Sequence, residues 1–480
     1  MTNNRTIPSE IFSFFSIAKS NSLLVKGAPG TGKTIFSLQC INELKEKTSG
    51  IYFSTRVDAK SLYEHFPWIK EQIPPERVID ATRSIAPKER DLAYVINYSS
   101  LPDFLKGLYS IVHKISQQQT PLIIVDSIDA LAANVKMPIE ETCSRLVNFA
   151  ESMNSQMIIV TERYDTSAID YIVDGIIKLE RRFIENRLLR RMRIEKLRGT
   201  EIRNPTYYFT LQNGKFQYFK KLPTYHLIDG SYEYAHHPPI RDSEDTKFFD
   251  SGKFSFGTEA MDEVFGGVRR GSLILFEVDD KMTMEDVITV TFPIVENFLT
   301  QKRYVLMSPS ENLHPDFLFK SLNKLVGEEV TSKYFKYLDK ILQYVEQDND
   351  IIKTQRKSKR ILKFLTDAIN KLKVEHGNPL SLLYLFIDTL ESLADVNNVF
   401  RVLSSIAAKT KKEGDLCIAL KLVSGRKGDE YYRKIADVVI KLFTLNGITF
   451  LYGIKPFTKI YNVNVDLTLP HPKLVLTPVV

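Results

Sequence analysis

One eight-residue run constrains the fold of this chain more than any other feature, because it joins an apolar stretch, residues 23–25, to a helical-looking one, residues 35–41. The run is Gly27, Ala28, Pro29, Gly30, Thr31, Gly32, Lys33 and Thr34. Its glycines allow backbone amides to close around the β- and γ-phosphates of a nucleotide, Lys33 adds a mobile positive charge, and the Thr34 hydroxyl can ligand magnesium. The pattern predicts a loop that binds ATP with Mg²⁺. The alternative is a glycine-rich turn with an incidental lysine.

The length and composition are those of a globular protein with more than one domain. At 480 residues the chain exceeds one ordinary core, and 43% hydrophobic with 26% charged residues is usual for folded proteins. No apolar run is long enough to cross a bilayer and no signal-peptide core follows residues 1–5, so we expect a cytoplasmic protein without membrane association. The net charge of +7 permits contacts with nucleic acid or with acidic proteins but does not require them.

The cysteines and histidines form no pattern typical of a metal site or a disulfide framework. Cys40, Cys143 and Cys417 are scattered among apolar neighbours, so we expect buried, reduced thiols. His236 and His237 precede two prolines, where a surface linker explains them better than a metal site does.

The second half of the chain repeats the pattern of the first. Three segments match in the same order: residues 271–276 with 21–26 (Ser272 on Ser22, a shift of 250), 383–389 with 121–127 (Asp388 on Asp126, a shift of 262), and 436–442 with 173–179 (Asp437 on Asp174, a shift of 263). Preserved order with slowly drifting spacing is typical of a duplication with insertions. We therefore predict two domains, residues 1–224 and 251–480, joined by a polar, proline-bearing linker over residues 225–250.

In each half, short apolar runs alternate with helical patterns, which predicts an α/β fold with a mainly parallel sheet buried on both faces. In the first half the runs are residues 23–25, 51–53, 122–125 and 157–160. Asp126 then ends a strand beside the phosphate loop, where it can hold magnesium together with Thr34. A helix N-cap is the alternative role for Asp126. Residues 320–373 are rich in lysine and glutamate with apolar residues at helical spacing, which favours amphipathic helices that cover a sheet over a dedicated partner-binding insert.

Together these segments resemble the RecA-like ATPases of the KaiC and archaeal RadA type, with two domains in tandem. Residues 252–258 and 261–271 look like the opening motif of a KaiC domain, and residues 161–163 and 194–200 look like that family's late-strand motifs. Residues 8–11 and 54–57 add a narrower resemblance to the GvpD group of archaeal gas vesicle regulators.

The resemblance implies a ring in which a Lys-x-Arg motif, here Lys196 and Arg198, reaches the nucleotide of a neighbouring subunit. Alternation along a strand points both side chains to one side, so they can contact a γ-phosphate jointly. Solvated strand charges are the alternative. The adjacent catalytic glutamates of KaiC proteins are absent after residue 53, where the chain reads Ser54-Thr55-Arg56-Val57-Asp58. We therefore expect slow hydrolysis, with Glu162 as a candidate substitute base.

The second half departs further from the family pattern. At the shift of 250, each key position of the loop has changed: Glu277 for Gly27, Asp280 for Gly30, Met282 for Gly32, Thr283 for Lys33 and Met284 for Thr34. Carboxylates repel polyphosphate, and side chains at the former glycines obstruct its approach to backbone amides. We predict that the second domain binds no ATP and that Asp388 is structural. Beyond Lys455 the second copy has also lost the arginine of the Lys-x-Arg motif.

Arginines concentrate between positions 181 and 203: Arg181, Arg182, Arg187, Arg190, Arg191, Arg193, Arg198 and Arg203. They suggest a patch for DNA or an acidic partner, or a subunit interface, whereas interspersed glutamates favour a solvated hairpin. The sequence thus supports an ATP-binding regulator that controls a protein partner, and the resemblance implies that it self-associates through RecA-like interfaces. The competing hypothesis is a DNA-stimulated accessory ATPase of recombination or repair.

Overall fold

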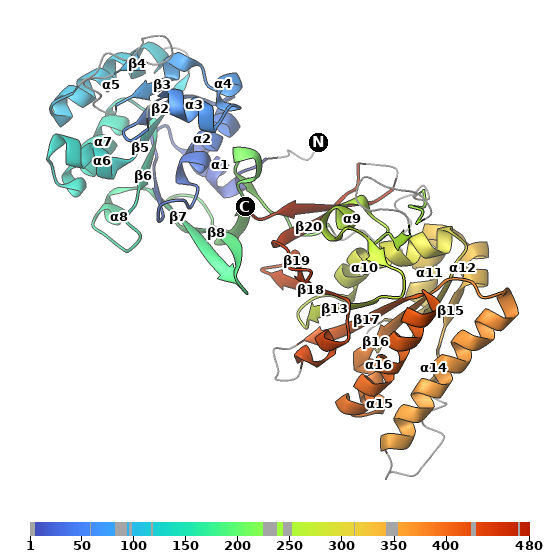
Figure 1. The fold of residues 1–480 in the computed structure, drawn as a ribbon. Coiled ribbons are helices and arrows are strands. Elements are labelled where there is room, and N and C mark those ends of the chain that lie inside the picture. The colour runs from blue at the N-terminus through green and yellow to red at the C-terminus, as the bar shows by residue number, and fades with distance from the viewer. Residues whose placement is uncertain are drawn as a thin grey trace. The chain divides into compact units, whose positions relative to one another are not determined.

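The computed structural model describes residues 5–57, 59–81, 94–95, 98–116, 119–223, 238–242, 252–311, 313–341, 354–423, 429–468 and 471–480. They divide into two compact units (Figure 1): Met1–Phe219 with Pro478–Val480, and Lys220–Thr477. Of the predicted linker at residues 225–250, only 238–242 is described, and His236 and His237 lie outside the described residues. Within 238–242, Asp242 is buried in the second unit and pairs with Arg270 and Arg303.

The first unit contains one mixed sheet, ordered β10-β9-β8-β7-β1-β6-β5-β2-β3-β4 among the described residues. Its strands are β1 (Ser22–Lys26), β2 (Thr48–Ser54), β3 (Val78–Asp80), β4 (Tyr94–Val95), β5 (Thr120–Asp126), β6 (Gln156–Thr161), β7 (Gly175–Ile184), β8 (Arg187–Leu197), β9 (Thr206–Thr210) and β10 (Gln217–Tyr218). The strands from β7 to β4 pair in parallel, whereas β8, β9 and β10 pair antiparallel. The four predicted apolar runs of this half lie in β1, β2, β5 and β6.

Helices cover both faces of this sheet (Figure 1). They are α1 (Ser9–Ile17), α2 (Lys33–Leu44), α3 (Ala59–His65), α4 (Ile69–Gln72), α5 (Leu101–Ser116), α6 (Ile128–Val135), α7 (Ile139–Ser152) and α8 (Ile169–Ile172), with 3-10 turns η1 (Pro75–Arg77) and η2 (Gln212–Gly214). Because strand side chains alternate, Leu23 and Val25 pack in one apolar cluster with α1 and α2, and Leu24 packs in the other with α5, α6 and α7. Burial on both faces explains why β1 is apolar through its centre.

The second unit contains a sheet ordered β15-β14-β16-β17-β13-β18-β19-β20-β21 among the described residues, and a small pair, β11-β12. Its strands are β11 (Lys253–Phe254), β12 (Val268–Arg269), β13 (Leu273–Asp279), β14 (Tyr304–Met307), β15 (Phe335–Tyr337), β16 (Ser381–Phe386), β17 (Leu416–Val423), β18 (Val438–Leu445), β19 (Ile448–Lys455), β20 (Tyr461–Asp466) and β21 (Lys473–Pro478). Its helices are α9 (Glu259–Phe265), α10 (Met284–Thr300), α11 (Pro315–Val326), α12 (Glu328–Tyr334), α14 (Thr354–His376), α15 (Ile387–Leu393) and α16 (Val396–Glu413), with the 3-10 turn η3 (Asp429–Lys434).

The two sheets have the same strand order. Reading β3-β2-β5-β6-β1-β7-β8-β9-β10 in the first unit gives β15-β14-β16-β17-β13-β18-β19-β20-β21 in the second. The predicted fold class, two tandem RecA-like α/β domains, is confirmed.

The sheet registers correct the predicted alignment of the first strands. Asp174 accepts a hydrogen bond from the Ser22 backbone amide, and Asp437 accepts the equivalent bond from Leu273, not from Ser272. The helices after the loops begin at Lys33 and Met284, which gives the same offset. The matched residues are therefore one position further along the second copy than the sequence suggested.

Other predictions from the sequence have clear outcomes. The amphipathic pattern before residue 373 is confirmed in α14, which buries Ile361, Leu365, Ile369 and Leu372 against the sheet. All three cysteines are buried and free. Within the described part of the chain, no helix is both long and apolar enough to span a membrane, and no three histidine, cysteine or carboxylate side chains gather as a metal cage.

Candidate nucleotide-binding site

The phosphate loop joins the end of β1 to the start of α2, as the sequence predicts. Two of its glycines are required by close approaches of the protein to its own backbone. A Cβ atom on Gly27 would lie 2.6 Å from Thr31 Oγ1 and 2.7 Å from the carbonyl oxygen of Leu179. Gly32 has a φ of 99°, and a Cβ atom there would lie 2.8 Å from Leu211. The loop is thus held tightly between its own turn, strand β7 and the residue that follows β9.

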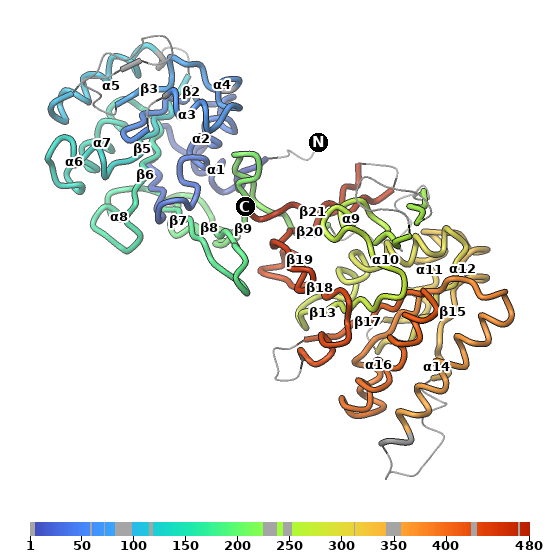
Figure 2. Tube along the Cα trace, viewed as in Figure 1, coloured from blue at the N-terminus to red at the C-terminus, as the bar shows by residue number. Residues whose placement is uncertain are grey.

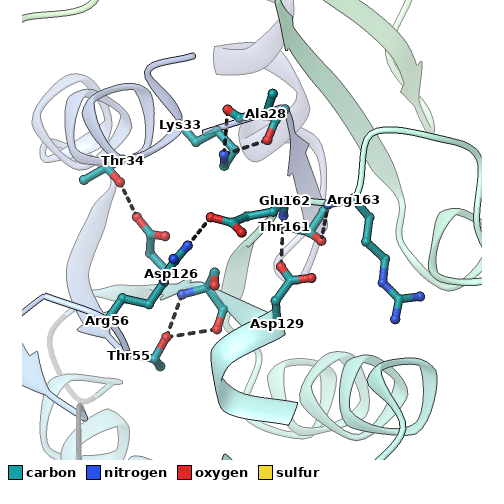
Figure 3. Close-up of polar contacts among 12 residues, drawn as sticks. Ala28, Lys33, Thr34, Thr55, Arg56, Asp126, Asp129, Thr161, Glu162 and Arg163 are labelled. Carbon is teal, nitrogen blue, oxygen red and sulfur yellow. Dashed lines mark hydrogen bonds and ion pairs between the residues drawn. The ribbon is translucent and has the colours of Figure 1, made fainter. Parts of the chain in front are cut away.

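Lys33 lies over this loop with most of its side chain buried. Its Nζ donates hydrogen bonds to the carbonyl oxygens of Gly27 at 2.6 Å and Ala28 at 3.1 Å (Figure 3). Burial lowers the pKa of Lys33, and this effect is opposed by the carboxylates of Glu162 and Asp126. The ammonium group is therefore positioned where the loop would hold phosphates, among carboxylates that favour its charged form.

Thr34 and Asp126 are in direct contact, as the predicted metal-side pair requires. The Thr34 hydroxyl donates to Asp126 Oδ2 at 2.6 Å, and the buried Tyr52 phenol donates to the same oxygen at 2.7 Å. Burial, followed by the charge of Asp126, raises the pKa of Tyr52 well above its ordinary value. The N-cap position of α6 is Ser127, so the Asp126 carboxylate bonds to side chains and does not cap the helix. A hydroxyl and a carboxylate are hard oxygen ligands, and they fit Mg²⁺.

Glu162 lies at the carboxyl end of β6, next to the predicted magnesium pair. Its side chain forms an ion pair with Arg56, which follows β2 (Figure 3). Its backbone amide donates to Asp129 Oδ2 at 2.9 Å. The prediction identified Glu162 but no role for Tyr52, Arg56 or Asp129, because their partners are far away in sequence.

These groups line one cleft of about 510 Å³, a volume within the range of small-molecule sites. Its wall includes Lys33, Thr34, Asp126 and Glu162 along with the apolar side chains of Leu62, Phe66 and Leu211. The cleft combines candidate phosphate ligands, candidate oxygen ligands for a divalent cation and an apolar wall, a combination that could hold a nucleotide with its metal.

Comparison with known proteins agrees with this geometry. A sequence model of the KaiC ATPase family matches residues 10–221. Residues 10–221 therefore form a KaiC-like domain by sequence match, called the KaiC domain below. The chain is also 25% identical to Protein GvpD2 of Halobacterium salinarum over 98% of its own length and 96% of GvpD2. It is 28% identical to Protein GvpD1 of the same organism over 68% of its own length, and the match spans only 60% of GvpD1. A UPF0273 protein of Thermotoga maritima is 28% identical over 38% of the chain.

Lys196 and Arg198 lie at the opposite end of the KaiC domain's sheet from its phosphate loop. Leu197 pairs with Gly175, and Gly175 pairs with the start of β1, whereas the loop follows the end of β1. Lys196 donates to the carbonyl oxygens of Val173 at 2.6 Å and Asp170 at 3.1 Å, and Arg198 donates to Asp174 at 2.7 Å. Burial, followed by the nearby charge of Arg198, lowers the pKa of Lys196. The two side chains cannot reach their own chain's loop, so a contact with nucleotide would have to come from another subunit.

The predicted arginine patch lies largely on the hairpin of β7 and β8, next to β9 (Figure 2). Most of its side chains are paired. Arg182 and Arg191 both pair with Glu180, and further pairs are Arg193 with Glu195, Arg198 with Asp174 and Arg203 with Glu201. Burial alone would raise the pKa of Glu180, but bonds from Tyr164 and Arg191 lower it overall. The glutamates among the arginines thus pair with them, as the solvated-hairpin alternative expects.

Two arginines of the hairpin approach the phosphate loop, which the sequence did not indicate. Arg190 donates to the carbonyl oxygen of Gly30 at 3.1 Å, and also to the backbone oxygen of Val480. The Arg181 guanidinium lies beside Gly30, 3.3 Å from where a Cβ atom would stand. Burial, followed by Arg181, lowers the pKa of Arg190 to about 10. The hairpin is thus in direct contact with the loop of the KaiC domain.

With the corrected register, different residues of the second unit stand at the positions of the phosphate loop. Val278 stands at the position of Gly27, Lys281 at Gly30, Thr283 at Gly32, Met284 at Lys33 and Glu285 at Thr34. The predicted pairings of this loop are thus wrong by one residue. The prediction that this domain binds no ATP is kept, because no lysine stands at the position of Lys33, no hydroxyl at that of Thr34 and no glycine in residues 278–285.

Asp388 was matched to Asp126 by the sequence, and the structure corrects this match too. Leu122 and Leu382 occupy equivalent positions in β5 and β16, which places Phe386 where the KaiC domain has Asp126. Asp388 accepts a bond from the Leu422 backbone amide at 2.8 Å, which copies the bond from Glu162 to Asp129. Asp388 also pairs with Lys421, whose pKa burial alone would lower but bonds to Asp388 and Glu391 raise. Asp388 is therefore the counterpart of Asp129.

The cavity that the described residues form at this end of the second sheet is small. The cavity lined by Met284, Phe386, Asp388 and Leu422, among others, holds about 20 Å³, enough for about one water molecule. The side chains that replace the ligands therefore also fill the position of the cleft.

Glu277 was expected in the second loop, and the structure places it in β13 instead. It is fully buried and forms a bidentate ion pair with Arg433, with distances of 2.5 and 2.7 Å. The equivalent pair in the KaiC domain is Lys26 with Asp170, at 2.8 Å. Each unit thus buries one ion pair beside its first strand, and the two pairs have opposite polarity.

Proposed function

We propose that this chain is a regulator whose first domain binds ATP with Mg²⁺, and whose nucleotide state controls a protein partner. The observation that carries the proposal is the difference between the clefts: about 510 Å³ lined by Lys33, Thr34 and Asp126 in one unit, against about 20 Å³ without those ligands in the other. A protein that binds one nucleotide per chain and retains a second, filled copy of the domain is better suited to switching than to rapid turnover. Similarity to GvpD2 over nearly the whole chain supports the same assignment.

The loop contacts offer a route by which bound nucleotide would act on the rest of the domain. Arg190 binds the carbonyl oxygen of Gly30, and the Leu179 carbonyl and Leu211 pack against Gly27 and Gly32. A phosphate chain that orders the loop would therefore shift β7, β8 and the turn after β9. The arginine-rich hairpin is the surface most directly coupled to the nucleotide, and we assign it to partner contact.

Hydrolysis, in this proposal, is slow. Bound Mg²⁺ would neutralise charge on the β- and γ-phosphates. Lys33 would hold the phosphates, and Thr34 with Asp126 would orient the metal. Glu162 is the carboxylate best placed to accept a proton from water, but its ion pair with Arg56 occupies it. We further propose that the domains self-associate, so that Lys196 and Arg198 complete the site of a neighbouring subunit.

The test is hydrogen exchange of the full chain with ATP and Mg²⁺, with ADP and Mg²⁺, and without nucleotide. We expect ATP to protect the phosphate loop and also residues 175–197, and we expect no such protection in Lys33→Ala. Partner capture with ATP-loaded protein, compared with the same variant, then identifies what the switch controls. Protection confined to the loop would contradict the proposed coupling.

The DNA-dependent alternative is decided by a separate assay. If single-stranded DNA raised the ATPase rate several-fold and bound with a steep salt dependence, the regulatory proposal would give way to an accessory role on DNA.

A further inference from the structure

The ion pair between Arg56 and Glu162 crosses the nucleotide cleft. In the sheet order β6-β5-β2, Glu162 follows the strand on one side of β5 and Arg56 follows the strand on the other. The pair therefore lies over the carboxyl end of β5, next to Asp126, and faces Lys33 (Figure 3). Both residues line the same cleft as Lys33 and Thr34.

The backbone on each side of this pair is fixed by other bonds. Next to Arg56, the Thr55 hydroxyl donates to the Ser127 carbonyl at 2.9 Å and accepts from the Ser127 amide at 2.7 Å. On the other side, the Glu162 amide is held by Asp129. The side chains of Arg56 and Glu162 are 52% and 33% exposed, respectively. The backbones are anchored, whereas the two charged groups are free to exchange partners.

The second unit indicates that the Glu162 side chain is not needed to form this corner of the fold. Leu422 stands at the equivalent position and donates its amide to Asp388, so the backbone anchor is kept. The carboxylate and the lysine of the phosphate loop have both been replaced, by Leu422 and Met284. The ion pair thus occurs in the unit with the cleft, and a purely structural need for Glu162 does not explain it.

Magnitudes favour an exchange of partners when a triphosphate binds. A half-exposed ion pair contributes only about 0–1 kcal/mol. A guanidinium binds phosphate through two parallel charge-assisted hydrogen bonds, which are stronger than ordinary ones. A γ-phosphate held by Lys33 would attract Arg56 and repel the Glu162 carboxylate, so both effects would separate the pair.

We propose that Arg56 is a γ-phosphate sensor that distinguishes ATP from ADP and releases Glu162 for hydrolysis. This inference rests on the proposed function, because it assumes that the cleft holds ATP. Arg56 leaves Glu162 and binds the γ-phosphate, and the freed carboxylate orients a water molecule. The water oxygen forms a bond to the γ-phosphorus, and the bond from that phosphorus to the β–γ bridging oxygen breaks with its electron pair leaving on ADP. The proton of the water passes to Glu162 and then to the released phosphate.

The experiment measures binding of a non-hydrolysable ATP analogue and of ADP, each with Mg²⁺, to the full chain by calorimetry. In Arg56→Ala we expect about 10-fold weaker binding of the analogue and ADP binding within about twofold of wild type, because only the γ-phosphate contact is lost. Arg56→Lys keeps the charge but not the paired bonds, so it should lie between the two. Glu162→Gln should bind the analogue at least as tightly as wild type and lower turnover by about 10-fold.

Arg163→Ala is the matched control. Arg163 is adjacent to Glu162 and 46% exposed, and it pairs with Glu140 outside the cleft. It should change neither affinity.

Equal losses for the ATP analogue and ADP in Arg56→Ala would overturn the sensor and indicate a structural role, and so would unchanged affinities. Failure of the proposed function looks different, because wild-type protein would then bind neither nucleotide. If the wild type binds both nucleotides but Arg56→Ala weakens both equally or neither, the sensor role of Arg56 is wrong and nucleotide binding by the cleft still stands.

Discussion

The two halves of this chain share a strand order, yet among the described residues a cleft of about 510 Å³ lies at the end of the first unit's sheet and a cavity of about 20 Å³ lies at the equivalent place in the second. Their difference lies in a few side chains at one end of the sheet. Lysine is replaced by Met284, aspartate by Phe386 and glutamate by Leu422. All three replacements exchange a charged group for an apolar one. The same sheet therefore forms with either set of side chains, because its apolar core stabilises it. The charged groups at its end are needed for a nucleotide site and not for the fold.

The buried ion pairs of the two units have opposite polarity, and mutation can convert one into the other. Lys26 is 1% exposed, so Lys26→Glu would bury a second carboxylate against Asp170. The change should lower the free energy of unfolding by about 3–5 kcal/mol. Adding Asp170→Arg copies the Glu277–Arg433 pair and should restore most of the loss. Urea denaturation of the three proteins measures this. If the double variant were as unstable as the single one, the two pairs would not be interchangeable.

The second comparison concerns pH. In the opening helix of the second unit, burial raises the pKa of Asp262 from 3.8 to about 6, although bonds from Ser255 and Phe256 partly oppose this. A carboxyl group whose pKa is raised on folding stabilises the fold below its unfolded pKa, and the contribution is lost as pH rises through the folded pKa. Relative to Asp262→Asn, wild type should therefore lose up to about 3 kcal/mol between pH 4 and pH 7. Parallel denaturation curves at the two pH values test this, and a constant difference would contradict it.

The third prediction sharpens the nucleotide assignment. Lys33→Ala should weaken ATP binding by at least about 100-fold, or about 2.7 kcal/mol, because it removes the charge that holds the phosphates. Met284→Ala, at the equivalent position, should leave the affinity unchanged. Calorimetry should give one ATP per chain for wild type. Two ATP per chain would refute the claim that the second domain is degenerate.

The smallest expected effect concerns assembly. Arg198 lies two residues after Lys196, and Phe457 lies two residues after Lys455 in the second copy. Both Arg198 and Phe457 are 65% exposed. Arg198→Ala should lower turnover by about 10-fold in assembled protein and leave dissociated subunits unaffected, because the contact is made to a neighbour. Phe457→Ala should not change turnover. Unchanged activity of assembled Arg198→Ala would favour the solvated-charge alternative.

Much of the fold and the centre of the site could be predicted, because both depend on local patterns. Four apolar runs became strands, and the contact of Thr34 with Asp126 follows from the placement of two strand ends on one edge of the sheet. The second copy was harder to align, because the residues that would have fixed its register had been lost. The matches at Glu277 and Asp388 were therefore wrong by one and two residues.

The remaining features depend on partners that no local pattern reveals. Tyr52 is an ordinary strand residue until the register brings it beside Asp126. Arg56 and Glu162 are 106 positions apart, and Arg190 and Gly30 are 160 apart. The arginine cluster was visible as charge, but its division into paired residues and loop contacts follows from the pairing of β7 with β8.

The reversed ion pair has a consequence for how a duplicated chain folds. Tandem copies with the same strand order risk exchanging strands during synthesis, since each sheet could accept the other's first strand. Such an exchange would bury Lys26 beside Arg433 and Glu277 beside Asp170, leaving two repelling charges in each misassembled core. Opposite polarity of the two pairs would therefore favour pairing of each first strand with its own sheet over pairing with the sheet of the other copy.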